Sequence, residues 1–513
     1  MEVIKYIFYA PKMEWIYFIL FVFGIIAFIT AAEKGRSKFG WPLEVNRKLV
    51  HILTGVLVFF TPFVFKSRAP LIWMGIIFVF VNLYSLRSGR LTGMHDTKRK
   101  SLGTVFYPIS FIIILIAFWK NFKSVIMISM LILAISDAIA AIAGERSKNP
   151  HSYSTGLEKK TVEGSIAMFL STFLIVIIIF PAISYIDGYK IGITSALWIA
   201  IITAITATSL ESISIYGSDN LSVPLGSAFI LHFMVVHSTG ANLQLSTGVI
   251  LAAVISVVSY YAHFLTLGGS IATFILGLFI FGIGGWPWAV PILVFFLTSS
   301  LLSKVGGKSK RRFKDIFEKT SRRDVGQVFA NGGLAGLIIL VYSYWPNSIF
   351  YYLYLGILAA VTADTWATEI GILSKSNPVS IQNFKRVEPG SSGGITLLGT
   401  AASFVGSLTI PLSALIVLFM SNSPRLVISK FTFWLIGFGG FAGSIVDTIL
   451  GAIVQAQYQC IKCNKKTEKK IHCKGEKGRL ISGIGWFNND LVNTFCCFTG
   501  FVFVLIGKIL NFD

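Results

Sequence analysis

Two aspartates stand inside long apolar segments, and they are the residues most suited to chemistry. Asp137 opens the segment Asp137–Gly144, and Asp364 lies within Ala363–Gly371. A carboxylate inside a membrane-spanning helix costs about 3 kcal/mol and usually has a function or a partner. Small residues follow Asp137 on the same helix face, where they would let a ligand approach the backbone while Asp137 holds a cation. The alternative is that these small residues serve helix packing and Asp137 caps a neighbouring helix.

Each of these segments is followed by a polar loop with phosphate-binding character. Lys159–Ser165 supplies two ammonium groups, a hydroxyl, the carboxylate of Glu163 and a glycine just before the next apolar segment. Lysines and backbone N–H groups at a helix N-terminus bind phosphate, and a nearby carboxylate would hold Mg²⁺ bridging phosphates. The second loop, Pro389–Gly394, is suited to a phosphate nest of backbone N–H groups. The alternatives are flanking lysines at a membrane boundary and a plain loop.

Acidic residues recur in the same order in two halves of the chain, 1–243 and 244–513. Glu211 and Asp447 each follow the first aspartate of their half by two apolar segments. An acid–amide pair comes next, Asp219-Asn220 in one half and Asn489-Asp490 in the other. This order predicts two related sites doing related chemistry.

Two other groups of residues have weaker signals. Arg47-Lys48 and His51, at the start of the second apolar segment, are either membrane anchors or phosphate ligands. Asp364 and Glu369 do not share one helix stripe, so both reach one site only from a helix end or a broken helix.

Five cysteines are present, and three of them have metal-ligand spacing with a histidine. Cys460, Cys463, His472 and Cys473 lie in one basic loop and are either a structural zinc site or reduced thiols. Cys496-Cys497 lies in an apolar segment and is expected to serve packing.

The composition predicts that these residues are positioned by membrane-spanning helices. The chain is 54% hydrophobic and 13% charged, and long apolar runs indicate an all-α polytopic transmembrane bundle of about 16 spans in two tandem halves. The expected spans lie near 14–32, 49–65, 70–86, 104–119, 124–144, 165–183, 191–208, 226–238, 246–266, 269–285, 288–303, 330–345, 350–372, 395–419, 432–454 and 491–507.

The basic residues alternate between loops in a way that predicts the orientation. The net charge is +21, and most Lys and Arg lie in loops that the positive-inside rule assigns to the cytoplasm, with the N-terminus outside. This placement favours the membrane over nucleic acid as the partner. The first span has its basic cluster after it, which is typical of a retained anchor. We expect a multi-pass protein with its active sites on the cytoplasmic face, in the cell membrane if the source is prokaryotic.

The first half resembles the CTP-dependent polyprenol kinases, which include dolichol kinase and phytol kinase. The resemblance lies in Arg47-Lys48-x-x-His51, Ser136–Gly144, Lys159–Ser165, Glu211 and Asp219–Pro224. In that family the aspartate and the Lys-Lys-Thr-x-Glu-Gly segment form the CTP site. The linker Asn149–Thr155 departs from the family pattern.

The second half is similar to a membrane family that includes phytyl-phosphate kinase. The similarity lies in Thr298–Ser300 with Lys304, Arg322–Asp324 with Gln327–Gly333, Ala363–Gly371, Val387–Gly394, Asp447–Ala452 and Asn489–Asn493.

Together the resemblances imply a bifunctional isoprenoid salvage kinase that uses CTP and Mg²⁺. The first half would phosphorylate phytol, geranylgeraniol or a similar alcohol, and the second would convert the monophosphate to the diphosphate. The implied catalytic residues are Asp137, Glu163, Asp219, Asp364, Glu369, Asp447 and Asp490, all but Glu369 also as Mg²⁺ ligands. The implied nucleotide- and phosphate-binding residues are Arg47, Lys48, His51, Gly144, Lys159, Lys160, Thr161, Gly164, Ser165, Asn220, Lys304, Arg323, Asn331, Gly390, Ser391, Ser392, Gly393, Gly394, Asn489 and Asn493.

Two other functions fit parts of the pattern. A cytidylyltransferase of a membrane lipid would release pyrophosphate from CTP rather than CDP. A lipid or ion transporter would use the buried acids to couple to cations and the repeats for alternating access. Lysine-rich loops between the spans favour a nucleotide site.

Overall fold

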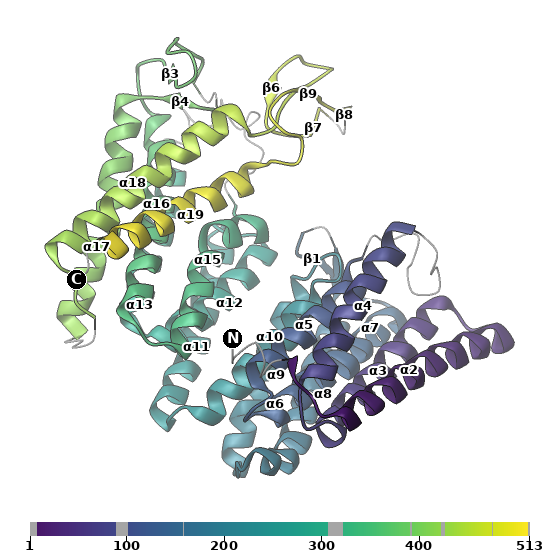
Figure 1. The fold of residues 1–513 in the computed structure, drawn as a ribbon. Coiled ribbons are helices and arrows are strands. Elements are labelled where there is room, and N and C mark those ends of the chain that lie inside the picture. The colour runs from purple at the N-terminus through teal and green to yellow at the C-terminus, as the bar shows by residue number, and fades with distance from the viewer. Residues whose placement is uncertain are drawn as a thin grey trace. The chain divides into compact units, whose positions relative to one another are not determined.

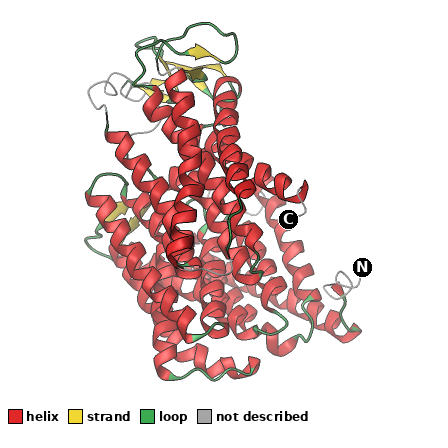
Figure 2. Ribbon diagram, turned by 90° about the vertical axis from the view of Figure 1, so that its left-hand side faces the viewer, coloured by secondary structure: helices red, strands yellow, loops and turns green. Residues whose placement is uncertain are grey.

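The computed structural model describes residues 8–88, 101–156, 158–305, 322–389, 392–421, 426–473 and 476–510. The chain divides into two compact units, Met1–Asn242 and Leu243–Asp513. Each unit is built almost entirely of helices, with short strands in the connections between them (Figures 1 and 2).

The first unit contains one β-hairpin among its helices. Its elements are α2 (Lys12–Phe39), α3 (Leu43–Val64), α4 (Ala69–Ser88), α5 (Gly103–Phe118), α6 (Lys123–Leu131), the π-helix η1 (Ile132–Ser136), α7 (Asp137–Arg146), β1 (Ser152–Ser154), β2 (Lys159–Thr161), α8 (Val162–Ile183), the 3₁₀-helix η2 (Ser184–Asp187), α9 (Ile193–Ser212) and α10 (Asp219–Val236). The strands β1 and β2 pair antiparallel.

The second unit has strands in two of its connections. Its elements are α11 (Thr239–Tyr261, which begins at the end of the first unit), α12 (Leu267–Gly284), α13 (Trp286–Lys304), α15 (Val325–Tyr344), α16 (Ser348–Gly371), β3 (Val379–Ser380), β4 (Gly394–Ile395), α17 (Leu397–Ser421), α18 (Lys430–Ile453), β5 (Gln457–Gln459), β6 (Lys466–Thr467), β7 (Ile471–His472), β8 (Glu476–Lys477), β9 (Arg479–Ser482) and α19 (Asn489–Leu510). Strands β3 and β4 pair, β7 and β8 pair, and the order β6-β5-β9 makes a three-stranded sheet.

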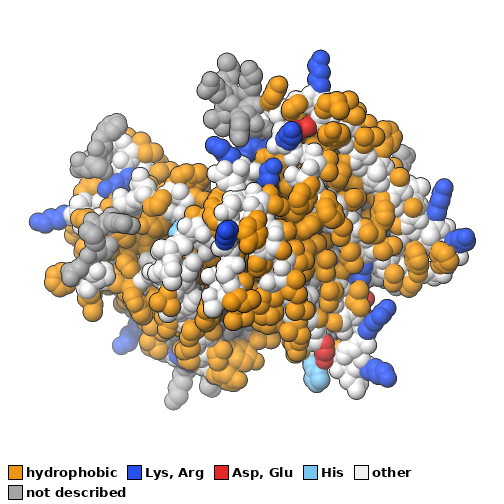
Figure 3. All heavy atoms as spheres, turned by 90° about the horizontal axis from the view of Figure 1, so that it is seen from below, with side chains coloured by type: hydrophobic (Ala, Val, Ile, Leu, Met, Phe, Trp, Pro, Cys, Tyr) orange, Lys and Arg blue, Asp and Glu red, His pale blue; other side chains and the backbone are white. Residues whose placement is uncertain are grey.

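The predicted all-α polytopic fold is confirmed. Among the described residues, 15 helices are long and apolar enough to cross a membrane, and the shorter apolar helix α5 matches the remaining expected span. Hydrophobic side chains cover much of the surface seen in Figure 3, as expected for helices that face lipid.

Two helices begin earlier than hydropathy predicts. The spans expected near 226 and 330 start at Asp219 and Val325 because their first turns are polar. In α15 the side chain of Asp324 accepts a hydrogen bond from the Gln327 N–H, and the Gln327 side chain bonds back to Asp324. Such a capping box begins a helix without adding any hydropathy.

Candidate functional site

A π-helical turn sets the position of Asp137 in the first unit. The turn η1 lies between α6 and α7, and π turns inside α-helices frequently mark functional sites. The His51 ring donates from Nε2 to the carbonyl of Leu133 in this turn, at 3.2 Å. Gly55 of α3 leaves room for Ala134, which a Cβ at Gly55 would overlap. His51 therefore holds the turn that carries Asp137, and its expected role as a phosphate ligand stays a prediction.

The β1–β2 hairpin directs Lys160 inward and Lys159 outward. Side chains alternate between the two faces of a strand, and Lys159 is exposed whereas Lys160 is largely covered. The Lys160 ammonium group donates to Glu211 Oε1 at 2.6 Å and to Ser214 Oγ at 3.1 Å. The side chains of Lys160 and Glu211 are only 15% and 10% exposed, so this ion pair is shielded from solvent.

Lys160 and three carboxylates that act on it electrostatically form what we call the carboxylate cluster. Burial disfavours the charge of Lys160, but the carboxylates of Glu211, Asp219 and Asp137 outweigh burial and raise the pKa of Lys160 above its usual value. Arg47 also interacts electrostatically with Asp137. The cluster joins α7, β2, α9 and α10 at one end of the unit. A cation surrounded by three acids is suited to binding phosphate together with a divalent metal.

Glu211 is a residue of this cluster that the expected site residues omit. Glu163, which they include, instead accepts hydrogen bonds from the backbone N–H and Nδ1 of His151, at 3.1 and 2.7 Å, and so closes the hairpin. The signal that could have identified Glu211 is its match to Asp447 in the second half. Asp219 lies in the first turn of α10, where Asn220 donates to its Oδ1 from both backbone and side chain at 2.9 Å.

Thr161, Gly144 and Ser165 make packing and capping contacts in this structure. Thr161 Oγ1 accepts from the Gly164 N–H at 3.1 Å and caps α8. A Cβ at Gly144 would lie 2.6 Å from Thr161 Oγ1. Ser165 bonds to the hydroxyl of Tyr153 at 2.6 Å. These contacts fit the packing alternative for the small residues between α7 and α8.

Lys48 pairs with a carboxylate near the C-terminal end of α7. Its ammonium group forms an ion pair with Glu145 at 2.5 Å. This pair joins α3 to the end of α7.

Replacing Lys160 by methionine is expected to destabilise the protein by about 3 kcal/mol, because Glu211 then remains buried without its partner. The measurement is the thermal unfolding midpoint in detergent. Lys160→Met/Glu211→Met should recover most of the loss, since no uncompensated charge is left. If the single and double variants lower the unfolding midpoint equally, Lys160 and Glu211 do not form a shielded ion pair.

In the second unit, three helices cross at contacts between small residues. A Cβ at Gly440 of α18 would lie 2.6 Å from Ala359 of α16, and one at Gly443 would lie 2.6 Å from Ala360. Gly443 also faces the carbonyl oxygen of Cys496 in α19, at 2.9 Å from the position of a Cβ. The helices α16, α18 and α19 therefore approach one another at backbone distance.

This crossing places two aspartates side by side. Asp364 and Asp447 each lie one helical turn beyond the crossing residues Ala360 and Gly443. Their side chains interact directly. The Asp447 Oδ2 atom is buried and accepts no hydrogen bond from the described residues. Two carboxylates in contact repel each other unless they share a proton or bind a cation, so the pair fits a metal ligand set.

The first turn of α19, which begins beside the end of α18, carries further polar residues. Asn489 and Asp490 begin the helix, and Asn493 lies one turn later, closer to the crossing at Cys496. The acid–amide pair therefore begins the last helix of the set, as Asp219-Asn220 does in the first unit.

The glycine-rich loop contacts the end of α18 one turn beyond Asp447. Ser392 Oγ donates to the carbonyl of Gly451 at 2.6 Å. Gly393 has φ of +76°, and a Cβ there would overlap Ala452, so this position requires glycine. The strand β4 begins at Gly394. Gly390 and Ser391 lie outside the described residues.

Gly500→Ala is expected to destabilise the second unit by roughly 2 kcal/mol, because its Cβ would overlap the carbonyl oxygen of Gly356. Gly333→Ala is the matched control, since its Cβ would meet only Phe329 at 3.5 Å. Thermal unfolding in detergent should separate the two variants. Similar unfolding midpoints for the two variants would show that the helices at Gly500 and Gly356 can move apart at little cost.

Comparison with known proteins gives the family. The model of the integral membrane protein family DUF92 matches residues 250–501. Protein PGR of Arabidopsis thaliana is 32% identical over 290 residues, which are 53% of this chain and 96% of that protein. The chain belongs to the DUF92 family of integral membrane proteins.

A phytol kinase is also among the relatives. The phytol kinase of Synechocystis sp. is 32% identical over 190 residues, which are 37% of this chain and 78% of that protein. An uncharacterized membrane protein of Methanocaldococcus jannaschii is 27% identical over 222 residues, 43% of this chain and 88% of that protein. No solved structure matches the chain.

The DUF92 region also contains an apolar cavity with an arginine in its wall. The cavity has a volume of about 80 Å³ and is lined by apolar residues of α11, α12, α13 and α15, together with Arg323, Gln327 and Asn331. The Arg323 guanidinium lies over the rings of Phe295 and Phe296, at 5.5 and 5.7 Å. The cavity therefore combines an apolar interior with one cationic group.

Arg323 also interacts electrostatically with Glu369 of α16. Burial lowers the pKa of Arg323 to about 10, and the Glu369 carboxylate opposes this shift. Asp364 thus interacts with Asp447 while Glu369 acts electrostatically on Arg323, as expected for residues on different stripes of one helix. Lys304 lies close by: its ammonium group donates to the Ala262 carbonyl at 3.0 Å and lies 4.0 Å from the centre of the Phe264 ring, and the Phe264 carbonyl accepts from the Arg323 N–H.

Proposed function

We propose that the chain is a membrane phosphotransferase with two sites, one in each unit. The first site phosphorylates a long-chain isoprenoid alcohol to its monophosphate, and the second converts the monophosphate to the diphosphate. CTP is the phosphoryl donor. The observation that carries the proposal is the carboxylate cluster, a cation among three carboxylates in a chain related to a phytol kinase.

The first step is a substitution at phosphorus. The alcohol oxygen forms a bond to the γ-phosphorus of CTP, the bond from that phosphorus to the bridging oxygen breaks, and CDP leaves. The hydroxyl proton passes to a carboxylate of the cluster or to water. Lys160 would bind and orient phosphate oxygens, since phosphoryl transfer depends mainly on positioning and charge neutralisation.

The carboxylates of both sites fit Mg²⁺, which prefers oxygen ligands. Asp137, Glu211 and Asp219 would hold it in the first site, and Asp364, Asp447 and Asp490 in the second. The ion would neutralise charge on the phosphates. The Asp447 oxygen without a hydrogen-bond partner among the described residues supports this assignment.

The second unit differs from the first in having a small apolar cavity with Arg323 in its wall. The cavity, at about 80 Å³, would take at most the first carbons of a prenyl chain whose phosphate meets Arg323. The glycine-rich loop beside α18 would bind nucleotide phosphates through backbone N–H groups. In this step a phosphate oxygen of the monophosphate forms the new bond to phosphorus, and CDP again leaves.

The polar ends of the helices face the cytoplasm in this proposal. The basic loops lie at that side by the positive-inside rule, where CTP is available. The isoprenoid chain dissolves in the bilayer, so the reacting hydroxyl is presented at the membrane boundary.

The test is an assay of the purified full chain in detergent with phytol or geranylgeraniol and γ-labelled CTP. Labelled monophosphate should form first and diphosphate later, with one CDP per transfer. Release of pyrophosphate would identify a cytidylyltransferase instead. If a folded sample consumes no CTP but moves the alcohol or an ion across vesicles, the protein is a transporter.

A further inference from the structure

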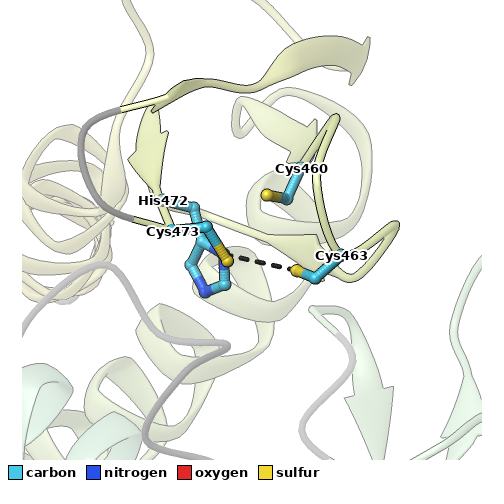
Figure 4. A group of neighbouring side chains, drawn as sticks. All are labelled: Cys460, Cys463, His472 and Cys473. Atoms are coloured by element: carbon cyan, nitrogen blue, oxygen red, sulfur yellow. Dashed lines mark hydrogen bonds between the residues drawn. The ribbon is translucent and has the colours of Figure 1, made fainter.

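The loop between α18 and α19 gathers three cysteines and a histidine at one point. Cys460, Cys463, His472 and Cys473 each offer a ligand atom, and these atoms all lie within 4.8 Å of one another. Figure 4 shows the four side chains converging from two separate parts of the loop. The four side chains range from buried Cys460 to exposed Cys463.

The backbone around Cys460 has the shape of a metal-binding turn. The Asn464 N–H donates to the Cys460 carbonyl at 2.9 Å, and the Cys460 N–H donates to the Lys465 carbonyl at 3.0 Å. Asn464 has a φ of +54°, which completes the tight turn. The turn brings Cys463 back beside Cys460, so one short segment supplies two ligand atoms.

The second pair of ligands comes from the β7–β8 hairpin. His472 Nδ1 lies 3.5 Å from Cys463 Sγ and 3.2 Å from Cys473 Sγ. Zinc bonds of about 2.3 Å to sulfur and 2.1 Å to nitrogen in a tetrahedron place such atoms roughly 3.6 Å apart. The ligands are therefore near the spacing that zinc requires.

The positive charge of the loop suits the negative charge of a zinc site with three thiolates. Three thiolates and a neutral histidine around Zn²⁺ have a net charge of −1. The same loop is rich in lysine among its described residues, at Lys462, Lys465, Lys466, Lys469, Lys470 and Lys477.

We propose that Cys460, Cys463, His472 and Cys473 bind one Zn²⁺, and that the ion stabilises the connection between α18 and α19. Four protein ligands fill the tetrahedron, which is typical of a structural and not a catalytic zinc site. The ion joins the turn after β5 to β7, and β5 also pairs with β9, which leads back to α19. The Ala456 N–H donates to the Phe487 carbonyl at 2.9 Å, so the ends of α18 and α19 meet at the base of the loop.

This connection lies between two proposed residues of the second site. Asp447 lies in the second-last turn of α18, and Asp490 lies in the first turn of α19. A closed loop would restrict the spacing of these helix ends. The zinc proposal itself depends only on the ligand geometry, so it stands or falls independently of the phosphotransferase assignment.

The first experiment measures metal in the full chain, purified without chelators and without a metal-affinity step. We expect about one zinc per chain. Cys463→Ser and Cys473→Ser should lose most of it, whereas Cys496→Ala, which removes a buried thiol of α19, should keep it. No zinc in the wild-type protein, iron in its place, or full zinc in both serine variants would overturn the proposal.

A second measurement uses only the wild-type protein, so it remains informative if the serine variants do not fold. Titration of the wild-type thiols with an organomercurial should release zinc in step with modification of the loop cysteines. Zinc removal should also make trypsin cut between residues 456 and 486 at least about tenfold faster, because the loop loses its crosslink. Release of no zinc, or unchanged cleavage after its removal, would contradict a stabilising ion.

Discussion

Asp364→Asn is expected to stop the reaction at the monophosphate. The substitution removes a charge with almost no change in shape, and it leaves Asp447 with an amide neighbour in place of a second metal ligand. Since neutralisation of phosphate charge is a main source of rate in phosphoryl transfer, the second step should slow on the order of a hundredfold or more. The first step should keep its rate, so prenyl monophosphate should accumulate.

The measurement is the ratio of monophosphate to diphosphate over time, with alcohol as the only isoprenoid supplied. Asp324→Asn is the matched control, because it makes the same change in the same unit and asparagine caps a helix as well as aspartate does. Loss of monophosphate formation in folded Asp364→Asn protein would contradict the assignment of the second step to this residue.

Hydropathy identified the helices because apolar length is a local property of the sequence. Each expected span has a helix in the structure, including the two short ones. The starts of α10 and α15 were placed late because Asp219-Asn220 and the Asp324–Gln327 capping box are polar. Hydropathy has no means of distinguishing a polar first turn from a loop.

The contacts of the site residues depended on information that no local pattern contains. Lys160 and Glu211 are 51 residues apart and meet only when α8, α9 and the hairpin pack together. Lys159 and Lys160 were grouped as phosphate ligands, but they lie on a strand, so they face opposite ways. Gly144, one of the small residues on the helix face of Asp137, lies against the Thr161 side chain, and Gly164 of the following loop lies against Thr161 and the backbone of α7.

Both units present the same order of elements around their acids. In the first, α7 is followed by a β-hairpin, α8, α9 and α10, with acids on α7, at the end of α9 and at the start of α10. In the second, α16 is followed by β3, β4, α17, α18 and α19, with acids at the matching places. The order of acidic landmarks in the sequence therefore has a structural counterpart, and it supports two sites with related chemistry. The zinc-ligand loop between α18 and α19 has no counterpart between α9 and α10, which are joined by a short turn.

Asp137→Asn is expected to give the opposite result to Asp364→Asn. The variant should lose the alcohol kinase step on the order of a hundredfold or more, because Asp137 is one of the three carboxylates around Lys160. It should still convert added prenyl monophosphate to the diphosphate at the normal rate. The measurement uses two parallel assays, one started from the alcohol and one from the monophosphate.

Asp187→Asn is the control in the same unit. Asp187 accepts hydrogen bonds from the backbone N–H groups of Lys123 and Ser124, at 2.8 and 2.7 Å, and caps α6 at the end away from the cluster. Asparagine can keep one of these bonds, so both steps should survive. If folded Asp137→Asn protein fails in both assays while Asp187→Asn protein is active, the two steps depend on a common centre. In that case the proposal of one independent site per unit is wrong. If Asp137→Asn protein instead loses only the alcohol kinase step, the DUF92 region must carry out the second step with its own acids.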